Sequence, residues 1–154
     1  MAIQWEKSSD FKGPEQSPGF LLWRASLEWR RSIDACLAPL ELTQPQFVVL
    51  AGTSWLTRNG EVVSQAHVAR HVGMDPNTMS QVLRGLERRR FLTRRVSPSD
   101  PAKHPRLTPR GQGLLSRALS SVESADAAFF GMLGNDSAVV VRLFTVLARI
   151  GQGS

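Results

Sequence analysis

The sequence has 154 residues, 42% of them hydrophobic, which is enough for one compact domain with an apolar core. Lysine and arginine total 19 against 13 acidic residues, and the formal net charge of +6 suits a polyanionic partner such as nucleic acid. No apolar stretch approaches the roughly 20 residues of a membrane-spanning helix, and the first residues do not resemble a signal peptide. We therefore expect a soluble cytoplasmic protein without a membrane partner.

The first part of the chain predicts an arm and two helices. Residues 1–16 are polar with scattered aromatics and predict a flexible N-terminal arm. Ser17 followed by proline is typical of a helix start, and apolar residues then recur at intervals of three and four, which predicts a long helix. Thr43 and the glutamine three residues later have the spacing of a capping box, so a second helix should run to about Leu56. Residues 62–63 could form one short strand.

The middle of the chain predicts a helix-turn-helix. Ser64 caps a short helix that ends at Gly73, and Asp75 immediately caps a further helix to about Arg90. At about 100° per residue, this last helix separates an apolar side from a polar side. The polar side carries groups suited to base edges, namely Asn77, Gln81, Arg84 and Arg88, flanked by Thr78 and Ser80.

Taken alone, such a helix is more often an ordinary solvated surface helix. The tight turn before it and the basic segment after it favour nucleic-acid binding instead. Residues 92–96 predict a strand, residues 97–101 a turn, and a second short strand should precede Thr108. Thr108 and the following proline predict a long helix to about Met132, and residues 134–136 break it.

The last helix, predicted over residues 137–150, is apolar around most of its circumference. Only Arg142, Thr145 and Arg149 break its apolar surface, as one narrow stripe. Such a helix has to be buried from more than one direction, which favours a second subunit as the cover. The predicted dimer interface consists of Phe20, Phe129, Phe130, Leu133, Val140, Leu143, Phe144 and Leu147.

Two possible chemical sites are weak. His67 and His71 lie four residues apart on a helix, but they lack the glutamate of a metalloprotease and should face outward. Cys36, the single cysteine, excludes an intramolecular disulfide and is better interpreted as a small buried hydrophobe than as a redox sensor. No catalytic or cofactor-binding motif is present, so we expect neither an enzyme nor a bound metal or cofactor.

Residues 43–111 resemble the MarR family of winged-helix regulators in an ordered set of segments. The matching segments are 42–50, 68–73, 75–86, 92–95 and 107–111, the last reading Leu-Thr-x-x-Gly. The resemblance implies a mainly helical winged helix-turn-helix at 41–108 with a two- to three-stranded wing sheet. It implies dimerisation helices at 17–40 and 109–154, and a homodimer that binds a pseudo-palindromic operator in a bacterium, usually as a repressor.

The pattern and the resemblance together predict the residues that contact DNA. They are Ser64, Pro76, Asn77, Thr78, Ser80, Gln81, Arg84, Arg88, Arg94, Arg95, Lys103, His104 and Arg106. The family also binds small aromatic or phenolic effectors in a cleft beside its first helices. The resemblance therefore makes Trp23, Trp29, Phe47 and Trp55 candidates for an effector pocket, although core packing explains these four aromatic residues equally well.

The chain departs from the family in two places. Arg90 stands where the family usually has glycine, and a positive φ at arginine costs free energy, so we expect an altered or strained helix end. The wing, residues 100–106, is about one residue short and lacks the arginine that enters the minor groove in the family. Lys103, His104 or Arg106 could replace it. The alternative function is a winged-helix module that uses its basic face on an acidic protein partner.

Overall fold

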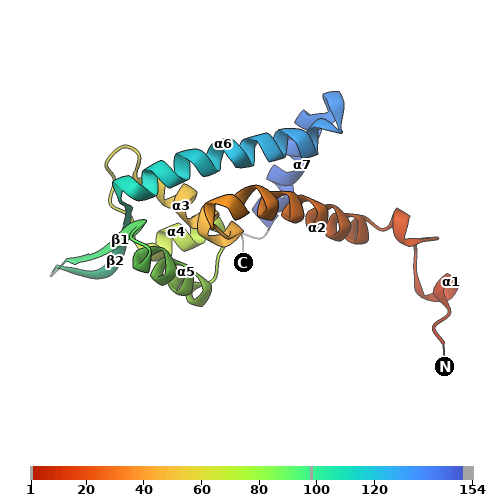
Figure 1. Ribbon diagram of the computed structural model, residues 1–154. Coiled ribbons are helices and arrows are strands. Elements are labelled where there is room, and N and C mark those ends of the chain that lie inside the picture. Colours follow the sequence, from red (N-terminus) through yellow and green to blue (C-terminus); the bar gives the residue numbers. More distant parts are fainter. Residues whose placement is uncertain (1, 98, 151–154) are drawn as a thin grey trace.

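The computed structural model describes residues 2–97 and 99–150 and has two connected parts (Figure 1). The long helices α2 and α6 pack side by side, and α3, α4, α5 and the β1–β2 hairpin gather at one end of them. The helices are α1 (Trp5–Ser8), α2 (Pro18–Leu37), α3 (Gln44–Thr57), α4 (Gln65–Val72), α5 (Pro76–Arg88), α6 (Pro109–Gly131) and α7 (Ser137–Ile150). Short 3-10 helices lie at η1 (Pro14–Gln16), η2 (Ala38–Leu40) and η3 (Gly134–Asp136), and the strands are β1 (Leu92–Ser97) and β2 (Asp100–Leu107).

Helices α2, α3 and α6 begin where the sequence predicts, because at each of these starts a side chain accepts a hydrogen bond from a free backbone N–H. Ser17 accepts from Phe20 N at 3.3 Å, and Thr43 and Gln46 form the complete capping box. Thr108 accepts from Gly111 N at 3.1 Å at the start of α6. All three helices also carry proline in the first turn. The expected helix boundaries are therefore confirmed to within two residues at these starts.

The core lies where α2 ends against the helix-turn-helix. Leu37, Leu50, Leu83 and Leu86 have no exposed surface there, and Leu92 of β1 is 1% exposed. Each such leucine contributes about 1.5–3 kcal/mol by burial, an upper range for a compact unfolded state. The core thus fixes the orientation of α5 relative to α2, α3 and the hairpin.

The sheet has two antiparallel strands in the described residues, with Leu92 opposite Leu107 and Arg95 opposite His104. The expected strand at residues 62–63 does not form: that segment pairs with nothing, and its first valine is 70% exposed. β2 is longer than predicted and begins at Asp100, inside the expected turn. Its two prolines are tolerated because each strand of a two-stranded sheet has a free edge. Pro98, part of the expected turn, lies outside the described residues.

The N-terminal arm extends away from the body beyond the start of α2 (Figure 1). The arm that the sequence predicts to be flexible holds two short helical segments, α1 and η1. Trp5 and Phe11 on it are 67% and 45% exposed. Within the described residues, no single helix is long and apolar enough to cross a membrane; α6 and α7 reach that length and composition only as a pair bent by 120°.

Candidate nucleic-acid interface

The helix-turn-helix is held by short-range caps. Ser64 caps α4 by accepting from His67 N at 3.2 Å, and Gly73 ends α4 with a φ of 69°. Asp75 caps α5, where its Oδ1 accepts from Asn77 N and Thr78 N at 3.0 Å each. The hydrogen bonds with Thr78 lower the pKa of the Asp75 carboxyl, so it carries its charge at the positive end of α5. The turn predicted between the two helices is confirmed.

One face of α5 is buried and the opposite face is open. Met79, Leu83 and Leu86 have no exposed surface. The side chains exposed on the other face are those of Pro76, Asn77, Thr78, Gln81, Arg84 and Arg88. They offer guanidinium, amide and hydroxyl groups along one helix face, the groups that read base edges in a major groove.

Ser64 and Ser80 are placed differently from the other predicted contacts. Ser64 is only partly exposed, and its hydroxyl caps α4. Ser80 is also partly exposed, and its hydroxyl accepts from Gln65 Nε2 at 3.2 Å, which joins α4 to α5. Both serines therefore hold the helix-turn-helix together, a role that the sequence pattern did not separate from base contact.

Arg90 adopts the left-handed conformation that glycine adopts most easily, with a φ of 60°. Phe91 N donates to Leu86 O at 3.0 Å, and Arg90 N donates to Glu87 O at 2.9 Å. This geometry is that of a Schellman end. The helix end is therefore not rearranged, and the strain expected at this position is carried by the arginine backbone, at a cost of about 1–2 kcal/mol.

The junction between the wing and α6 explains the Leu-Thr-x-x-Gly motif. Thr108 N donates to Phe91 O at 3.0 Å, and its hydroxyl donates to Arg90 O at 2.8 Å. A Cβ added at Gly111 would lie 1.9 Å from Phe91 O. The start of α6 thus packs directly on the backbone that follows α5, and only glycine fits.

Arg94 does not present a free cation, contrary to its predicted role in DNA contact. Its Nη2 and Nε donate to Glu87 Oε2 at 2.6 and 3.1 Å, and its side chain is 9% exposed. Hydrogen bonding from Arg94 lowers the pKa of the Glu87 carboxyl, so the pair is ionised near neutral pH. Because its charge and donors are used in this pair, Arg94 fixes the base of the wing to α5, and we withdraw it as a phosphate contact.

The rest of the wing contains one pair between side chains of the wing itself and three exposed cationic side chains. His104 Nε2 lies 2.9 Å from Asp100 Oδ2, and the His104 side chain is 17% exposed. The other carboxylate oxygen of Asp100 accepts from Ala102 N at 2.9 Å. His104 is therefore occupied within the wing and is less available to DNA than predicted, whereas Arg95, Lys103 and Arg106 are exposed.

The two histidines of α4 are exposed, as expected. The described residues contain no group of three or more His, Cys, Asp or Glu side chains placed to hold a metal ion. Cys36 on α2 is partly buried, and burial, followed by the nearby Asp126 carboxylate, raises the pKa of its thiol. A raised pKa disfavours the reactive thiolate, in agreement with a packing role.

The four aromatic residues predicted to form an effector pocket do not converge. Trp23 and Trp55 are 61% and 57% exposed, and the Arg58 guanidinium stacks on Trp55 at 3.8 Å. Phe47 packs against the core instead. Trp29 lines an apolar cavity, and its Nε1 donates to Asp126 Oδ1 at 2.8 Å, a contact not evident in the sequence.

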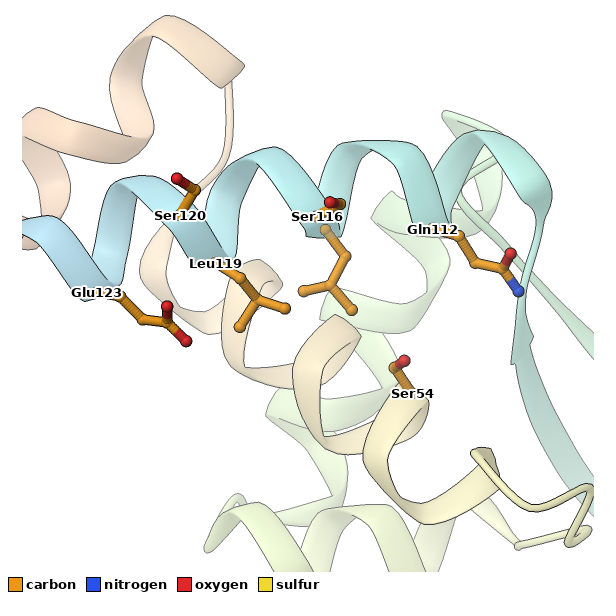
Figure 2. A pocket seen from close by; sticks show the side chains of 7 residues that line it. Ser54, Gln112, Ser116, Leu119, Ser120 and Glu123 are labelled. Atoms are coloured by element: carbon orange, nitrogen blue, oxygen red, sulfur yellow. The ribbon is translucent and has the colours of Figure 1, made fainter.

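That cavity, of about 500 Å³, lies between α2, α6 and α7 and is apolar apart from Ser26. Besides Trp29 it is lined by Leu22, Phe129, Phe130 and Phe144 among others. A second hollow is a groove between α3 and α6 (Figure 2), where Ser54, Gln112, Ser116 and Glu123 supply polar groups. None of the four predicted aromatic residues lines this groove, so it does not form the predicted aromatic pocket.

The predicted dimer-interface residues form an open apolar surface on α2, α6 and α7. Phe20, Leu133, Leu143, Phe144 and Leu147 are between 42% and 53% exposed, so their own subunit covers only part of each. Phe130 meets Phe129 and Phe144 edge to face, with ring centroids 5.1 and 6.3 Å apart, and Val140 lines the apolar cavity beside them. Large apolar side chains exposed on neighbouring elements are typical of a surface that packs against a partner.

Sequence comparison identifies relatives of this fold. The MarR family model matches residues 41–100. The HTH-type transcriptional regulator YdcH of Bacillus subtilis is 37% identical over 129 residues, 83% of this chain and 86% of the relative. The HTH-type transcriptional repressor Rv2887 of Mycobacterium tuberculosis is 39% identical over 110 residues, 71% of this chain and 76% of the relative.

Solved structures agree with the sequence comparison. CouR from Rhodococcus jostii, bound to p-coumaroyl-CoA, has a TM-score of 0.79 and 26% identity, over 94% of this chain and 98% of that one. Rv2887 in complex with DNA has a TM-score of 0.65 and 32% identity, over 90% and 98% of the two chains. Rv2887 has also been solved with salicylic acid. By sequence and by fold, the chain belongs to the MarR family of helix-turn-helix transcriptional regulators.

Proposed function

We propose that this chain is a bacterial, cytoplasmic transcriptional regulator that binds duplex DNA as a homodimer. It acts as a repressor and has no catalytic role. The observation that carries the proposal is the open face of α5, where Asn77, Gln81, Arg84 and Arg88 project opposite a fully buried apolar side. Two facts about the relative Rv2887 support the proposal: its structure has been solved in complex with DNA, and it is a transcriptional repressor.

In this proposal, the second subunit packs against the apolar surface on α2, α6 and α7. A two-fold dimer carries two α5 helices, which can enter successive major grooves about one helical turn, roughly 34 Å, apart. Each operator half-site would then contact one α5, and the exposed Arg95, Lys103 and Arg106 of each wing would lie near the flanking backbone.

Arg84 tests the reading of bases, because it lies near the middle of the open face and forms no ion pair within the described residues. Arg84→Ala should weaken binding to the preferred duplex by about 1–3 kcal/mol and relax the base preference at one position. Titration of the preferred and a random duplex at one salt concentration measures both effects. An equal loss of affinity for the two duplexes would indicate that Arg84 contacts phosphate, and it would contradict base reading by this residue.

A small aromatic effector is the second part of the proposal. It is supported by the salicylic acid complex of Rv2887 and by the apolar cavity that holds Trp29 beside the proposed dimer surface. A ligand there would shift the two subunits, and with them the spacing of the α5 helices. Salicylate, benzoate and hydroxycinnamate should be tested for release of the bound duplex, with Trp29→Leu as the variant that loses the response. Release that persists in this variant would place the effector elsewhere.

A further inference from the structure

A hollow of about 320 Å³ lies on the side of the molecule where η2, the end of α5 and the start of α6 meet. It is lined by three arginines, Arg89, Arg110 and Arg117, together with Glu41 and Phe91 and an apolar rim. We call it the arginine pocket. It begins at the end of α5 that is opposite the Asp75 cap, and it shares no residue with the open face described above.

Two of the arginines are held in place around one aromatic ring. The guanidinium carbons of Arg89 and Arg110 lie 4.8 and 5.1 Å from the centroid of Phe91. Arg89 Nη1 also donates to Glu41 O at 2.7 Å. Arg117 follows Arg110 by seven residues on α6, two turns along the same helix face. Two of the three guanidinium groups are therefore held at the hollow before any ligand binds, which lowers the entropy lost on binding.

The positive charge of the arginine pocket is only partly balanced. Its lining holds a single carboxylate, Glu41, whose side chain is 87% exposed and lies 3.8 Å from Arg89 Nη2. Neither Arg110 nor Arg117 forms an ion pair in the described part of the chain. Arginines in such a cluster repel one another unless an anion lies between them, and the planar guanidinium group matches phosphate oxygens in pairs.

We propose that the arginine pocket binds a phosphate group. The phosphate could belong to a small phosphorylated ligand or to the DNA backbone; both present the same oxygens to the guanidinium groups. The proposal does not depend on how α5 reads bases, because the arginine pocket shares no residue with the open face of α5.

Arg117→Gln is the main test, since the Arg117 side chain forms no ion pair with another described residue and the variant should fold normally. Arg110→Gln is the second variant, Arg117→Lys retains the charge, and Arg30→Gln on α2 is the control arginine outside the pocket. Circular dichroism should show the same helix content in all of them. The probes are inorganic diphosphate, titrated calorimetrically at constant ionic strength, and a random-sequence duplex, titrated over a range of salt concentrations.

If the source is a small ligand, diphosphate should bind the wild-type protein once per chain. Binding should then weaken at least about tenfold in Arg117→Gln and Arg110→Gln, and less in Arg117→Lys. If the source is DNA, the salt slope of duplex binding should fall by about one unit in each Gln variant but not in Arg30→Gln. The proposal is overturned if diphosphate does not bind and the slopes stay unchanged, or if the control changes as much as the pocket variants. A wild-type protein that binds diphosphate but no duplex would contradict the proposed function and leave the arginine pocket standing.

Discussion

Gly111 packs against the carbonyl of Phe91, and its missing side chain is what lets α6 start there. In Gly111→Ala the new Cβ would overlap a backbone atom that cannot move independently, so the free energy of unfolding should fall by about 1–3 kcal/mol. Chemical denaturation at a fixed protein concentration measures the change.

Gly113, two residues further along α6, is the matched control, because a Cβ there meets no atom within 4 Å. Gly113→Ala should raise the free energy of unfolding by about 0.5–1 kcal/mol, since alanine loses less backbone entropy in a helix. The assignment of Gly111 to a packing role fails if both alanine variants change stability in the same direction.

Side chains whose partners lie two or three residues away could be predicted from the sequence. Thr43, Ser64, Asp75 and Thr108 all cap helices as expected. The role of Arg94 could not be predicted, because the position of Glu87 beside it depends on how the strand packs on the helix. Likewise, the sequence predicts that Trp23, Trp29 and Trp55 lie on the first helices, but only packing decides that Trp29 lines the apolar cavity between α2, α6 and α7.

At the scale of elements, the wing contains one arginine, Arg94, that is paired with Glu87, whereas its other cationic side chains are exposed to solvent. Arg95→Gln and Lys103→Gln should each lower the slope of log binding constant against log salt concentration by about one unit, because each removes one phosphate contact. Duplex titrations between low and moderate salt measure the slopes.

Arg94→Gln provides the contrast, because it removes the same charge from a partly buried pair with Glu87. It should loosen the wing but leave the salt slope unchanged. If Arg94→Gln lowers the slope as much as Arg95→Gln, then Arg94 leaves Glu87 to contact DNA and our revision of its role is wrong. The expected third strand at residues 62–63 shows a related limit, since strand propensity without a pairing edge does not form a sheet.

At the scale of the whole molecule, we expect the chain to be one subunit of a symmetric dimer. Phe144→Asp would place a carboxylate in the apolar surface, where burial by a partner costs several kcal/mol, so the dimer should dissociate at micromolar concentration. Binding to duplex DNA should be lost although α5 is unchanged. Analytical ultracentrifugation measures the association of the subunits.

Thr145→Asp is the control on the same helix, because Thr145 lies in the narrow polar stripe of α7. This variant should remain dimeric and bind DNA. A wild-type protein that sediments as a monomer and still binds its operator would contradict the dimer model, as would a dimer that survives Phe144→Asp unchanged.

Selection of bound duplexes from a random pool tests the central claim most directly, because it reports sequence preference, symmetry and half-site spacing together. A homodimer that inserts two α5 helices should enrich a pseudo-palindrome whose half-sites are centred about 10 base pairs apart. Arg84→Ala should enrich the same palindrome with one base position relaxed in each half. Recovery of a non-symmetric sequence, or of no preferred sequence at a salt concentration where the protein still binds DNA, would contradict the account.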